Sequence, residues 1–558
     1  MTGLNHEDSN YWTRVSRRVS RRTVLRGGVG ASLATGLFLM GCSSSDEDAP
    51  ATTDTSATGT TAATGTTASA APADETVTVT ISGLGNQNYD PAKASGLGEE
   101  FANAHFGEAL VIMGPEKNTY VGGIAESWEA TGDDGLTWVF NIREGVTAHD
   151  GSTITPDDVA YTVERWIDPA NEPVSGATMQ RILDSVEVSG QQVIFKLKEP
   201  YPFVVHLGYM QITPRAAVEA AGAAFGEQPI SAGPFRFVSS RPDQGVTLEA
   251  FEGHYRKVPG FKTLELLHVP EVTTRLASLQ AGESDIMLKP SGPAIPALES
   301  GTDGISMHES PSTSANAIYF LDLGRPESLV GSPWQDVRMR QAVAHAVDID
   351  QLIERIYFGR ATAVAIPAAV PGLPGLPDLQ PRAYDPAEAQ KLIAAAGYEG
   401  LEFPIYTYES GAQAGSNDVT QALSTYLNAV GFNTQGNLIE YATFFENIRG
   451  GVWAGEGALS LQVVGARASE SFLGVVDPAG SPSYYSEELA AEAKRLYTVT
   501  GEDLLAGTGA LAQQYYDLLV NVPLVSANYV QGFGPRIASW EPRMRAGYEL
   551  GMEYIELA

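Results

Sequence analysis

The sequence predicts an α/β protein of several domains. Segments with the alternation of β-strands are interspersed along the chain with segments that carry helix-start and helix-stop signals. No unit of 20–50 residues repeats along the chain. The 558 residues suffice for two to four domains at about 100–200 residues each.

Strand signals begin after residue 75. The alternation of β-branched and small residues in TVTVTIS, residues 76–82, predicts the first strand, and the folded body is expected to start near Val77. LTWVFNIR, residues 136–143, predicts another strand. Residues 186–198 predict a hairpin that turns near Ser189-Gly190, and a longer hairpin is expected over residues 235–251.

Helix boundaries are signalled as clearly. Thr155, followed by Pro156 and two acids, predicts a capped helix start. The same pattern at Asp385 begins a helix that Gly397 ends. The spacing of apolar residues across 336–359 predicts one long helix.

The composition excludes several classes of function. With 35 Lys and Arg against 67 Asp and Glu, the formal charge is −32, which repels phosphate backbones and disfavours nucleic-acid binding. The single Cys cannot form an internal disulfide or a Cys₂His₂ or Cys₄ zinc site. An apolar fraction of 43 % argues against global disorder.

Residues 1–41 have the organisation of an export signal. Six Arg precede the apolar run over residues 27–41. Fifteen helical residues span about 22 Å, short of a bilayer core of about 30 Å, so a permanent transmembrane anchor is disfavoured. Removal of this segment leaves 29 basic and 65 acidic side chains, a formal charge of −36.

Two short motifs indicate what kind of export signal this is. SRRTVLR, residues 20–26, resembles the twin-arginine (Tat) signal, although export by the Sec route stays open. LMGC, residues 39–42, resembles a bacterial lipobox, which implies cleavage before Cys42 and lipidation of that residue. The alternative is an ordinary buried Cys. Residues 42–76, rich in Ser, Thr and Ala, are expected to form a disordered tether.

The segments of the body together resemble the extracytoplasmic solute-binding proteins of peptide/opine/nickel-type ABC importers, family 5. The matching stretches, in the order of the family, are residues 124–165, 231–240, 255–287, 334–361, 384–398 and 521–530. The resemblance covers essentially residues 77–558.

This resemblance implies a two-lobed periplasmic-binding-protein-like (type II) fold with an extra subdomain inserted in lobe I. The lobe I core is expected over residues 77–108, 230–315 and 525–558. The inserted subdomain is expected over 109–229 and lobe II over 316–524. The ligand would lie between the lobes, which close around it by a hinge motion.

By the same resemblance, the loop after the first strand faces the ligand. Its Asn86, Asn88 and Tyr89 offer amide and phenol groups. The alternative is a plain polar turn.

Peptide-binding relatives carry in lobe II an Asp that pairs with the peptide amino terminus. In the corresponding stretch, residues 459–474, that position falls on Gly465 or Arg467, so the carboxylate is missing. Arg467 favours a carboxylate or a phosphate. The ligand is therefore expected not to be a standard short peptide held by its amino terminus. Glu470 as a displaced acid would keep peptides as the runner-up, and Arg467 as a solvated loop residue is the simpler alternative.

Three aromatic residues complete the candidate ligand-binding set. Trp453, in the glycine-rich GGVWAGEG, is either a stacking platform or a core residue. Tyr441 follows a strand-like segment, and Tyr529 lies on a strand that returns beside the hinge.

No constellation for catalysis or for metal binding is present in the sequence. G-x-S-x-G, H-E-x-x-H, P-loop and EF-hand motifs are missing, so no catalytic residue, cofactor or metal is expected. His149 lies in a turn and His345 in an apolar helix, where local hydrogen bonding is the simpler interpretation.

The sequence thus predicts a lipid-anchored, non-enzymatic receptor on the outer face of the cell membrane. It is expected to be a monomer that captures a peptide-like, opine-like or other small organic solute and delivers it to an ABC permease with its ATPase subunits. A surface sensor of the same fold that does not serve transport, and more distantly a secreted hydrolase, are the alternatives.

Overall fold

The chain divides into two units, Met1–Ser69 and Ala70–Ala558. The computed structural model describes residues 72–84, 87–93, 97–114, 120–132, 135–168, 170, 177–201, 210–310, 312, 314–324, 331–367, 375–408, 415–465, 472–473, 476, 486–499, 501–545 and 548–558. All of these belong to the second unit. The predicted signal peptide, Cys42 and nearly all of the predicted tether therefore lie outside the described residues.

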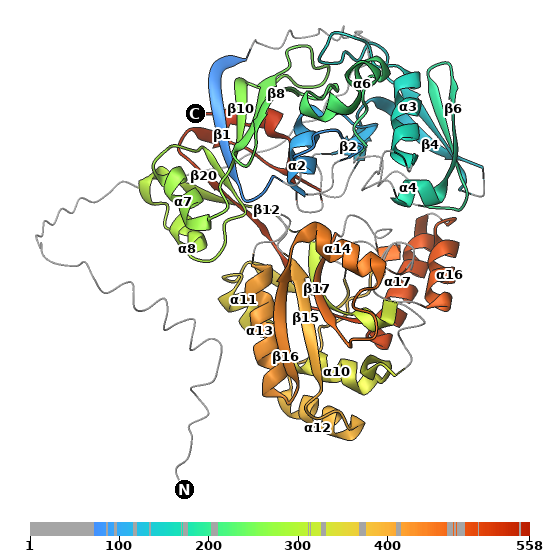
Figure 1. Ribbon diagram of the computed structural model, residues 1–558, viewed down its shortest axis with the longest axis vertical. Coiled ribbons are helices and arrows are strands. Elements are labelled where there is room, and N and C mark those ends of the chain that lie inside the picture. Colours follow the sequence, from blue (N-terminus) through green and yellow to red (C-terminus); the bar gives the residue numbers. More distant parts are fainter. Residues whose placement is uncertain are drawn as a thin grey trace, which may run out of the picture. The chain divides into compact units, whose positions relative to one another are not determined.

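The part that we call lobe I consists of a seven-stranded sheet and the helices that are named below (Figure 1). Its strands, in spatial order, are β12 (Ser306–Ser310), β20 (Tyr529–Phe533), β11 (Ile286–Leu288), β1 (Ala73–Ile81), β10 (Phe261–His268), β9 (Gly245–Ala250) and β8 (Phe235–Arg241). β1 runs parallel to β10 and β11, and the other pairs are antiparallel. Its helices are α2 (Leu97–Phe106), α7 (Val272–Gln280) and α8 (Ala294–Glu299).

The first strand begins four residues earlier than the expected start of the folded body. β1 starts at Ala73, whose backbone N–H donates to the carbonyl of Gly260 at 3.0 Å. Residues 73–76 are exposed and carry no apolar alternation, so backbone pairing with β10 orders them. The buried Val77 and Val79 behind them carry the pattern that the sequence shows.

An antiparallel four-stranded sheet lies between β1 and β8 in the sequence. Its order is β4 (Ala125–Thr131), β5 (Thr137–Ile142), β7 (Gln192–Leu197) and β6 (Leu183–Ser189). The β6–β7 hairpin turns at Gly190, as predicted. The helices of this region are α3 (Pro156–Ile167), α4 (Ala177–Ile182) and α6 (Arg215–Ala221), and the short pair β2 (Val111–Met113) and β3 (Tyr120–Gly122) precedes β4. Thr155 caps α3, also as predicted, and the structure adds a capping box between Thr155 and Asp158.

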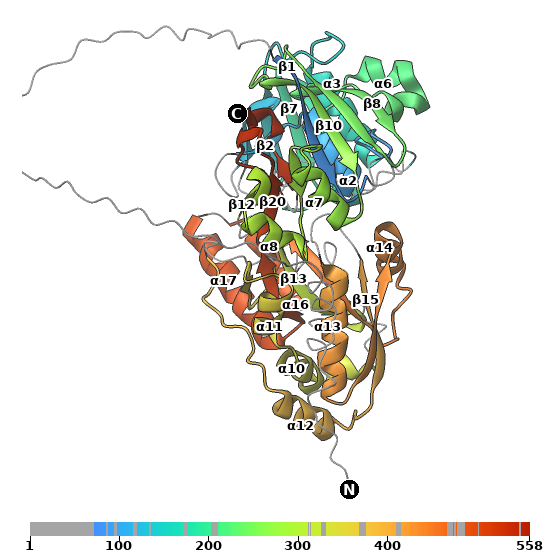
Figure 2. The same ribbon diagram turned by 90° about the vertical axis from the view of Figure 1, so that its left-hand side faces the viewer.

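A five-stranded sheet with helices forms the part that we call lobe II. Its order is β16 (Asn433–Ile439), β15 (Glu402–Tyr408), β17 (Leu459–Gly465), β13 (Ser314–Phe320) and β18 (Asn521–Pro523). Its helices are α10 (Val337–Ala346), α11 (Ile349–Arg355), α12 (Pro386–Ala396), α13 (Ser416–Ala429), α14 (Tyr441–Gly450), α16 (Glu487–Leu496) and α17 (Gly501–Leu518). Figure 2 shows α13 running along β15.

The single long helix predicted over residues 336–359 is wrong. The structure has two helices, because Val347 adopts an extended backbone conformation after α10. Asp348 then caps α11, its side chain accepting a hydrogen bond from the N–H of Gln351 at 3.0 Å. α11 ends at Arg355, four residues before Gly359. The capping Asp was present in the sequence, but the apolar spacing continued across it.

The chain crosses between the two lobes at two points that lie side by side. β12 ends at Ser310 and β13 begins at Ser314, and the returning chain passes from β19 (Val525–Ala527) to β20. β19 pairs with β14 (Ala361–Ala363). Two short antiparallel pairings near the C-terminus, β21 (Ile537–Ser539) with β24 (Glu556–Leu557) and β22 (Arg543–Arg545) with β23 (Tyr548–Leu550), complete the fold. None of the helices in the described part of the chain is long and apolar enough to cross a bilayer.

Candidate functional site

Two neighbouring cavities lie where the chain crosses between the lobes. The first, here the hinge cavity, has about 600 Å³ of space including its open mouth and is lined by residues 289–291, 295, 314, 356–357, 360 and 527–530. The second, here the cleft cavity, has about 760 Å³ on the same measure and is lined by residues 82, 270–272, 275, 289, 291, 415, 417 and 418. Lys289 and Ser291 line both, so the two cavities share a wall.

The lobe I wall of the cleft cavity follows the carboxyl ends of three strands. β1 runs parallel to β10 and β11, so the residues after each strand meet at one edge of the sheet. Ser82, Pro270 and Lys289 are three of these residues. Crevices at the carboxyl ends of parallel strands are the usual ligand sites of open α/β sheets. Lobe II supplies the opposite wall with the start of α13, from Gly415 to Asp418.

Lys289 has an unusual backbone conformation and a buried counter-charge. Its φ of 49° lies in the left-handed region, which costs a non-glycine residue of order 1–3 kcal/mol. Its ammonium lies 3.8 Å from Oε2 of Glu549, and the two side chains are 15 % and 0 % exposed. Burial lowers the pKa of Lys289 and raises that of Glu549, and the attraction between the two charges opposes both shifts.

Arg275 holds the wall beside Lys289. This buried guanidinium donates to the carbonyls of Val269 and Pro270, both at 2.7 Å, and to the carbonyl of Lys289 at 3.5 Å. The three acceptors belong to the turns that follow β10 and β11. Arg275 therefore ties the ends of two strands together at the edge of the cleft cavity.

The two crossing segments are hydrogen-bonded to each other. The hydroxyl of Tyr529 lies 2.8 Å from that of Ser314, and Ser526 donates to the Ser314 carbonyl at 2.9 Å. The side-chain amide of Asn528 donates to Glu309 at 2.6 Å. These bonds hold the crossings together without filling the hinge cavity.

Arg360 joins lobe II to lobe I at the same place. Its guanidinium forms ion pairs with Glu299, at the end of α8, and with Glu309 on β12. Its carbonyl accepts a hydrogen bond from the backbone N–H of Asn528 at 2.9 Å. Arg360 thus connects lobe II to both a helix and a strand of lobe I.

A second contact joins lobe II to the four-stranded sheet region. Nζ of Lys494, on α16, lies 3.1 Å from Oε2 of Glu199, whose other carboxylate oxygen pairs with Arg181. The rings of Tyr201 and Tyr497 pack with their centroids 5.5 Å apart. This contact and the hinge residues are far apart in the sequence and use different elements of both lobes.

Of the residues predicted for ligand binding, Tyr529 lies at a cavity. Its side chain is 5 % exposed and lines the hinge cavity. Asn86, Arg467 and Glu470 lie outside the described residues. Tyr441 is the first residue of α14.

The other predicted residues do not line either cavity. The side chain of Asn88 accepts a hydrogen bond from the N–H of Asp90 at 3.2 Å, as in a polar turn. Tyr89 is 1 % exposed, with its ring 5.2 Å from that of Phe237. Asn88 thus lies in a polar turn, the alternative that the sequence left open, and Tyr89 is buried against Phe237 rather than placed at a cavity.

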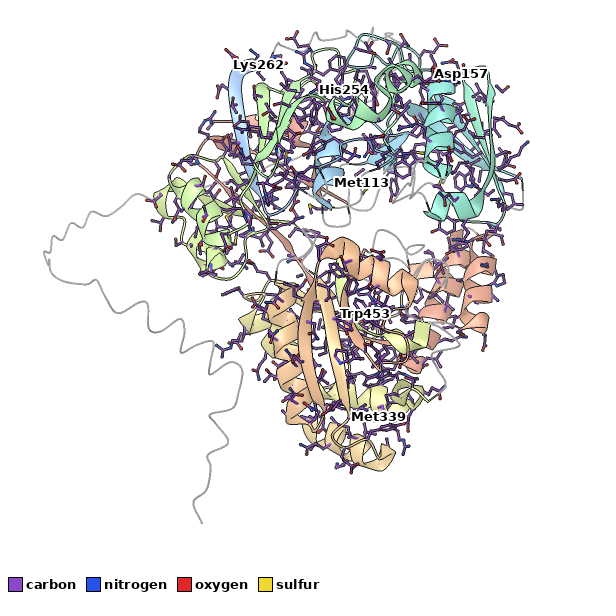
Figure 3. The ribbon with its side chains drawn as sticks, viewed as in Figure 1. Met113, Asp157, His254, Lys262, Met339 and Trp453 are labelled. Carbon is purple, nitrogen blue, oxygen red and sulfur yellow. The ribbon has the colours of Figure 1, made fainter. Side chains whose placement is uncertain are left out.

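Trp453 likewise belongs to a core. It is 6 % exposed, stacks on Tyr406 at a centroid distance of 4.1 Å and packs against Phe444 (Figure 3). The glycines around it suggested an exposed platform, but Tyr406 covers one face of the indole. Core packing, the alternative left open by the sequence, is what the structure shows.

The residues that sequence reasoning missed are Lys289, Arg275 and Arg360. The available signal was a Lys directly after the apolar triplet IML and before Pro-Ser-Gly, a pattern typical of the end of a buried strand. Recognising it required knowing that β11 is parallel to β1. In the described part of the chain no three His, Cys, Asp or Glu side chains are grouped so as to hold a metal ion.

Comparison with known proteins gives concordant results. Residues 119–455 match the family described as bacterial extracellular solute-binding proteins, family 5 Middle. Heme-binding protein A of Haemophilus influenzae is 31 % identical over 301 residues, which are 49 % of this chain and 53 % of that protein. The dipeptide-binding protein of Escherichia coli K12 is 28 % identical over 304 residues, 50 % of this chain and 55 % of that one. The chain thus spans about half the length of the curated relatives it matches.

A solved structure agrees in fold over a larger part of the chain. The dipeptide-binding protein of Pseudoalteromonas sp. SM9913, in complex with Met-Leu, superposes with a TM-score of 0.74 at 17 % identity and covers 87 % of this chain and all of that one. The predicted two-lobed α/β fold is confirmed. Because the family match extends over more than half of its residues, the chain belongs to the bacterial extracellular solute-binding proteins of family 5.

Proposed function

We propose that the chain is the substrate-binding receptor of an ABC importer, which captures a small organic solute between its lobes and delivers it to the permease and its ATPase subunits. The observation that carries the proposal is the pair of cavities at the crossing segments, lined by residues of both lobes. A solute bound there contacts both lobes at once and so stabilises their closed arrangement.

The contacts between the lobes fit this role. Arg360 and the crossing segments occupy the hinge side, and Lys494 with Glu199 joins the lobes elsewhere. Exposed or half-exposed ion pairs of this kind contribute about 0–1 kcal/mol each, so they can form and break during a cycle of capture and release. Contacts of this modest strength are compatible with hinge closure around a ligand.

The relatives support a binding function and span a range of ligands. One relative is named for heme and another for dipeptides, and the solved structure holds Met-Leu. We propose a peptide-like, opine-like or other organic ligand for this chain, and not a short peptide held by its amino terminus, because Gly465 or Arg467 stands where the acid is expected. Arg467 and Glu470 remain proposed ligand contacts.

We further propose that the protein is a lipoprotein of the outer face of the cell membrane. The Arg-rich export signal and LMGC, residues 39–42, support lipidation at Cys42, and the Ser/Thr/Ala-rich residues after it support a tether. The domain limits expected from the resemblance, with residues 109–229 inserted in lobe I, form part of the same proposal. We propose a monomer without catalytic activity or a cofactor.

Native mass spectrometry of the gently purified full chain tests the receptor function. We expect a non-covalent adduct of one small molecule per chain that is lost on unfolding, because such cavities retain their solutes during purification. Recovery of a short linear peptide would support the receptor function but contradict the preference against peptides. A chain that carries no adduct and takes up none from an extract of its growth medium would contradict the receptor function itself.

A further inference from the structure

Lys289 stands out among the cations of the two cavities. It follows β11 at the carboxyl edge of the sheet and lines both the hinge cavity and the cleft cavity. A side chain in the shared wall is within reach of a solute in either cavity. Among the described residues, no other charged side chain lines both.

The other two cations of these walls are committed to holding the protein together. Arg275 donates to carbonyls of the turns after β10 and β11, and Arg360 pairs with Glu299 and Glu309. Lys289 faces a carboxylate, Glu549, at 3.8 Å, which is an ion-pair distance but longer than a hydrogen bond. The ammonium is a compact charge on a flexible stem, and it can turn toward a second anion without losing the first.

The surroundings of Glu549 show that it is placed as a counter-charge. Its carboxylate is completely buried, and among the described residues its Oε2 has no hydrogen-bond partner. Its Oε1 accepts a long hydrogen bond of 3.4 Å from Gln531, on β20. A buried carboxylate with so few donors attracts a nearby cation, and this attraction opposes the effect of burial, which lowers the pKa of Lys289.

The backbone of Lys289 is held in place by its neighbours. Its φ of 49° is adopted at the turn into Pro290, and its carbonyl accepts a hydrogen bond from Arg275. Strained backbone that the surroundings enforce is common at ligand sites. Here it fixes the direction in which the side chain leaves the end of β11.

We propose that Lys289 recognises an anionic end of the solute. Its ammonium binds a carboxylate of the ligand, and Glu549 lies behind it as the fixed counter-charge. The proposal rests on the receptor function argued above. It adds that the preferred solutes carry a carboxylate, which amino-acid-derived compounds such as peptides and opines share.

The test compares matched acids and esters on matched variants of the full chain. The probes are the dipeptide Met-Leu, the opine octopine, the methyl esters of both, and sodium acetate as the minimal carboxylate. The key variant is Lys289→Met combined with Glu549→Gln, which removes both charges and leaves no buried unpaired carboxylate. Lys289→Arg keeps the charge. Lys262→Met is the control, because Lys262 is an exposed lobe I cation paired with Asp74.

Binding is measured by calorimetry, and folding of each variant by its thermal unfolding. We expect at least one free acid to bind the wild-type chain, and its ester to bind roughly 10- to 100-fold more weakly, the loss of one charge-assisted hydrogen bond. The double variant is expected to bind the free acid more weakly by the same factor. Lys289→Arg and Lys262→Met are expected to keep the preference for the acid over its ester. Preference for Met-Leu or for octopine separates peptide from opine ligands.

Three results would overturn the proposal. They are an ester that binds as tightly as its acid, a folded double variant that binds the acid like the wild type, and a chain that binds none of the free acids. In each case a one-to-one adduct in native mass spectrometry would leave the receptor function standing while Lys289 is excluded as its anion-binding residue. Loss of the adduct as well would reject both.

Discussion

Replacement of Arg256 by Met is expected to lower the free energy of unfolding by about 3–5 kcal/mol. Arg256 joins two buried carboxylates: Glu108, which it contacts at 3.0 and 3.2 Å, and Glu553 at 2.9 Å. Burial alone would raise the pKa of Glu108, but Arg256, with His254 and Tyr255, holds it near 2. Without Arg256, the two carboxylates remain buried with no full counter-charge. His254, which contacts Glu108 in the same cluster, marks its place in Figure 3.

An exposed ion pair and the acidic members of the buried cluster supply the controls. Arg236→Met breaks an exposed ion pair with Glu249, and we expect a loss of only about 0–1 kcal/mol. Adding Glu108→Gln and Glu553→Gln to Arg256→Met is expected to restore part of the stability, because neutral amides remove the uncompensated charge. Urea unfolding measures all three. Equal losses for Arg256→Met and Arg236→Met would show that the buried cluster is not a stabilising element.

Acidification from pH 7.5 to 5.0 is expected to cost about 2 kcal/mol through His149 alone. In the folded chain Nδ1 of His149 accepts from the Ser231 N–H at 3.4 Å, and Nε2 lies 3.1 Å from the Gly233 carbonyl. This arrangement requires the neutral ring with its proton on Nε2, since a proton on Nδ1 would face another donor. Burial lowers the pKa of His149 to about 4 from its usual 6.5.

The sign follows from the two pKa values. Above pH 6.5 the ring is neutral in both states, and His149 leaves the stability unchanged. Between pH 6.5 and 4 the unfolded chain binds a proton that the folded chain does not, so stability falls by about 1.4 kcal/mol per pH unit. Below pH 4 the loss levels off.

Urea unfolding at several pH values, compared between the wild type and His149→Gln, isolates this contribution. The variant is expected to be less stable near neutral pH but to lose about 2 kcal/mol less than the wild type between pH 7.5 and 5.0. His345→Gln is the matched control, since that ring is half-buried and contacts the Ala383 carbonyl at 2.7 Å. Parallel pH profiles for the wild type and His149→Gln would exclude the buried neutral ring as a source of acid sensitivity.

Local signals predicted local structure well. The capping box at Thr155, the helix from Pro386 to the αL residue Gly397, and the hairpin at Gly190 all depend on residues within a few positions of one another. Short-range hydrogen bonds decide such features, and their donors and acceptors are legible in the sequence. The division of α10 from α11 shows the limit, since an apolar spacing that favoured one helix crossed the cap at Asp348.

The candidate site could be predicted far less well from the sequence, because tertiary contacts create it. Lys289 becomes notable only when Glu549, 260 positions later, lies behind it and when β11 lies parallel to β1. For the same reason the sequence left Trp453 undecided between a stacking platform and a core residue. Its glycine-rich neighbourhood is visible in the sequence, but Tyr406, which covers it, belongs to a different strand. Tyr529 was predicted on a strand that returns beside the hinge, and it does begin β20 and line the hinge cavity, while its contact with a ligand stays a prediction.

Closure of the lobes around a solute is the central claim, and a distance between them tests it most directly. Residues 43–558 contain no Cys, so the full chain with Cys42→Ser accepts spin labels at introduced Glu129→Cys and Glu399→Cys, exposed positions of the four-stranded sheet and of lobe II. A pair at Glu399 and Asp517, both in lobe II, is the control. We predict that the solute recovered by native mass spectrometry shortens the first distance and leaves the second unchanged. Saturating solute with no change in the first distance would contradict the account.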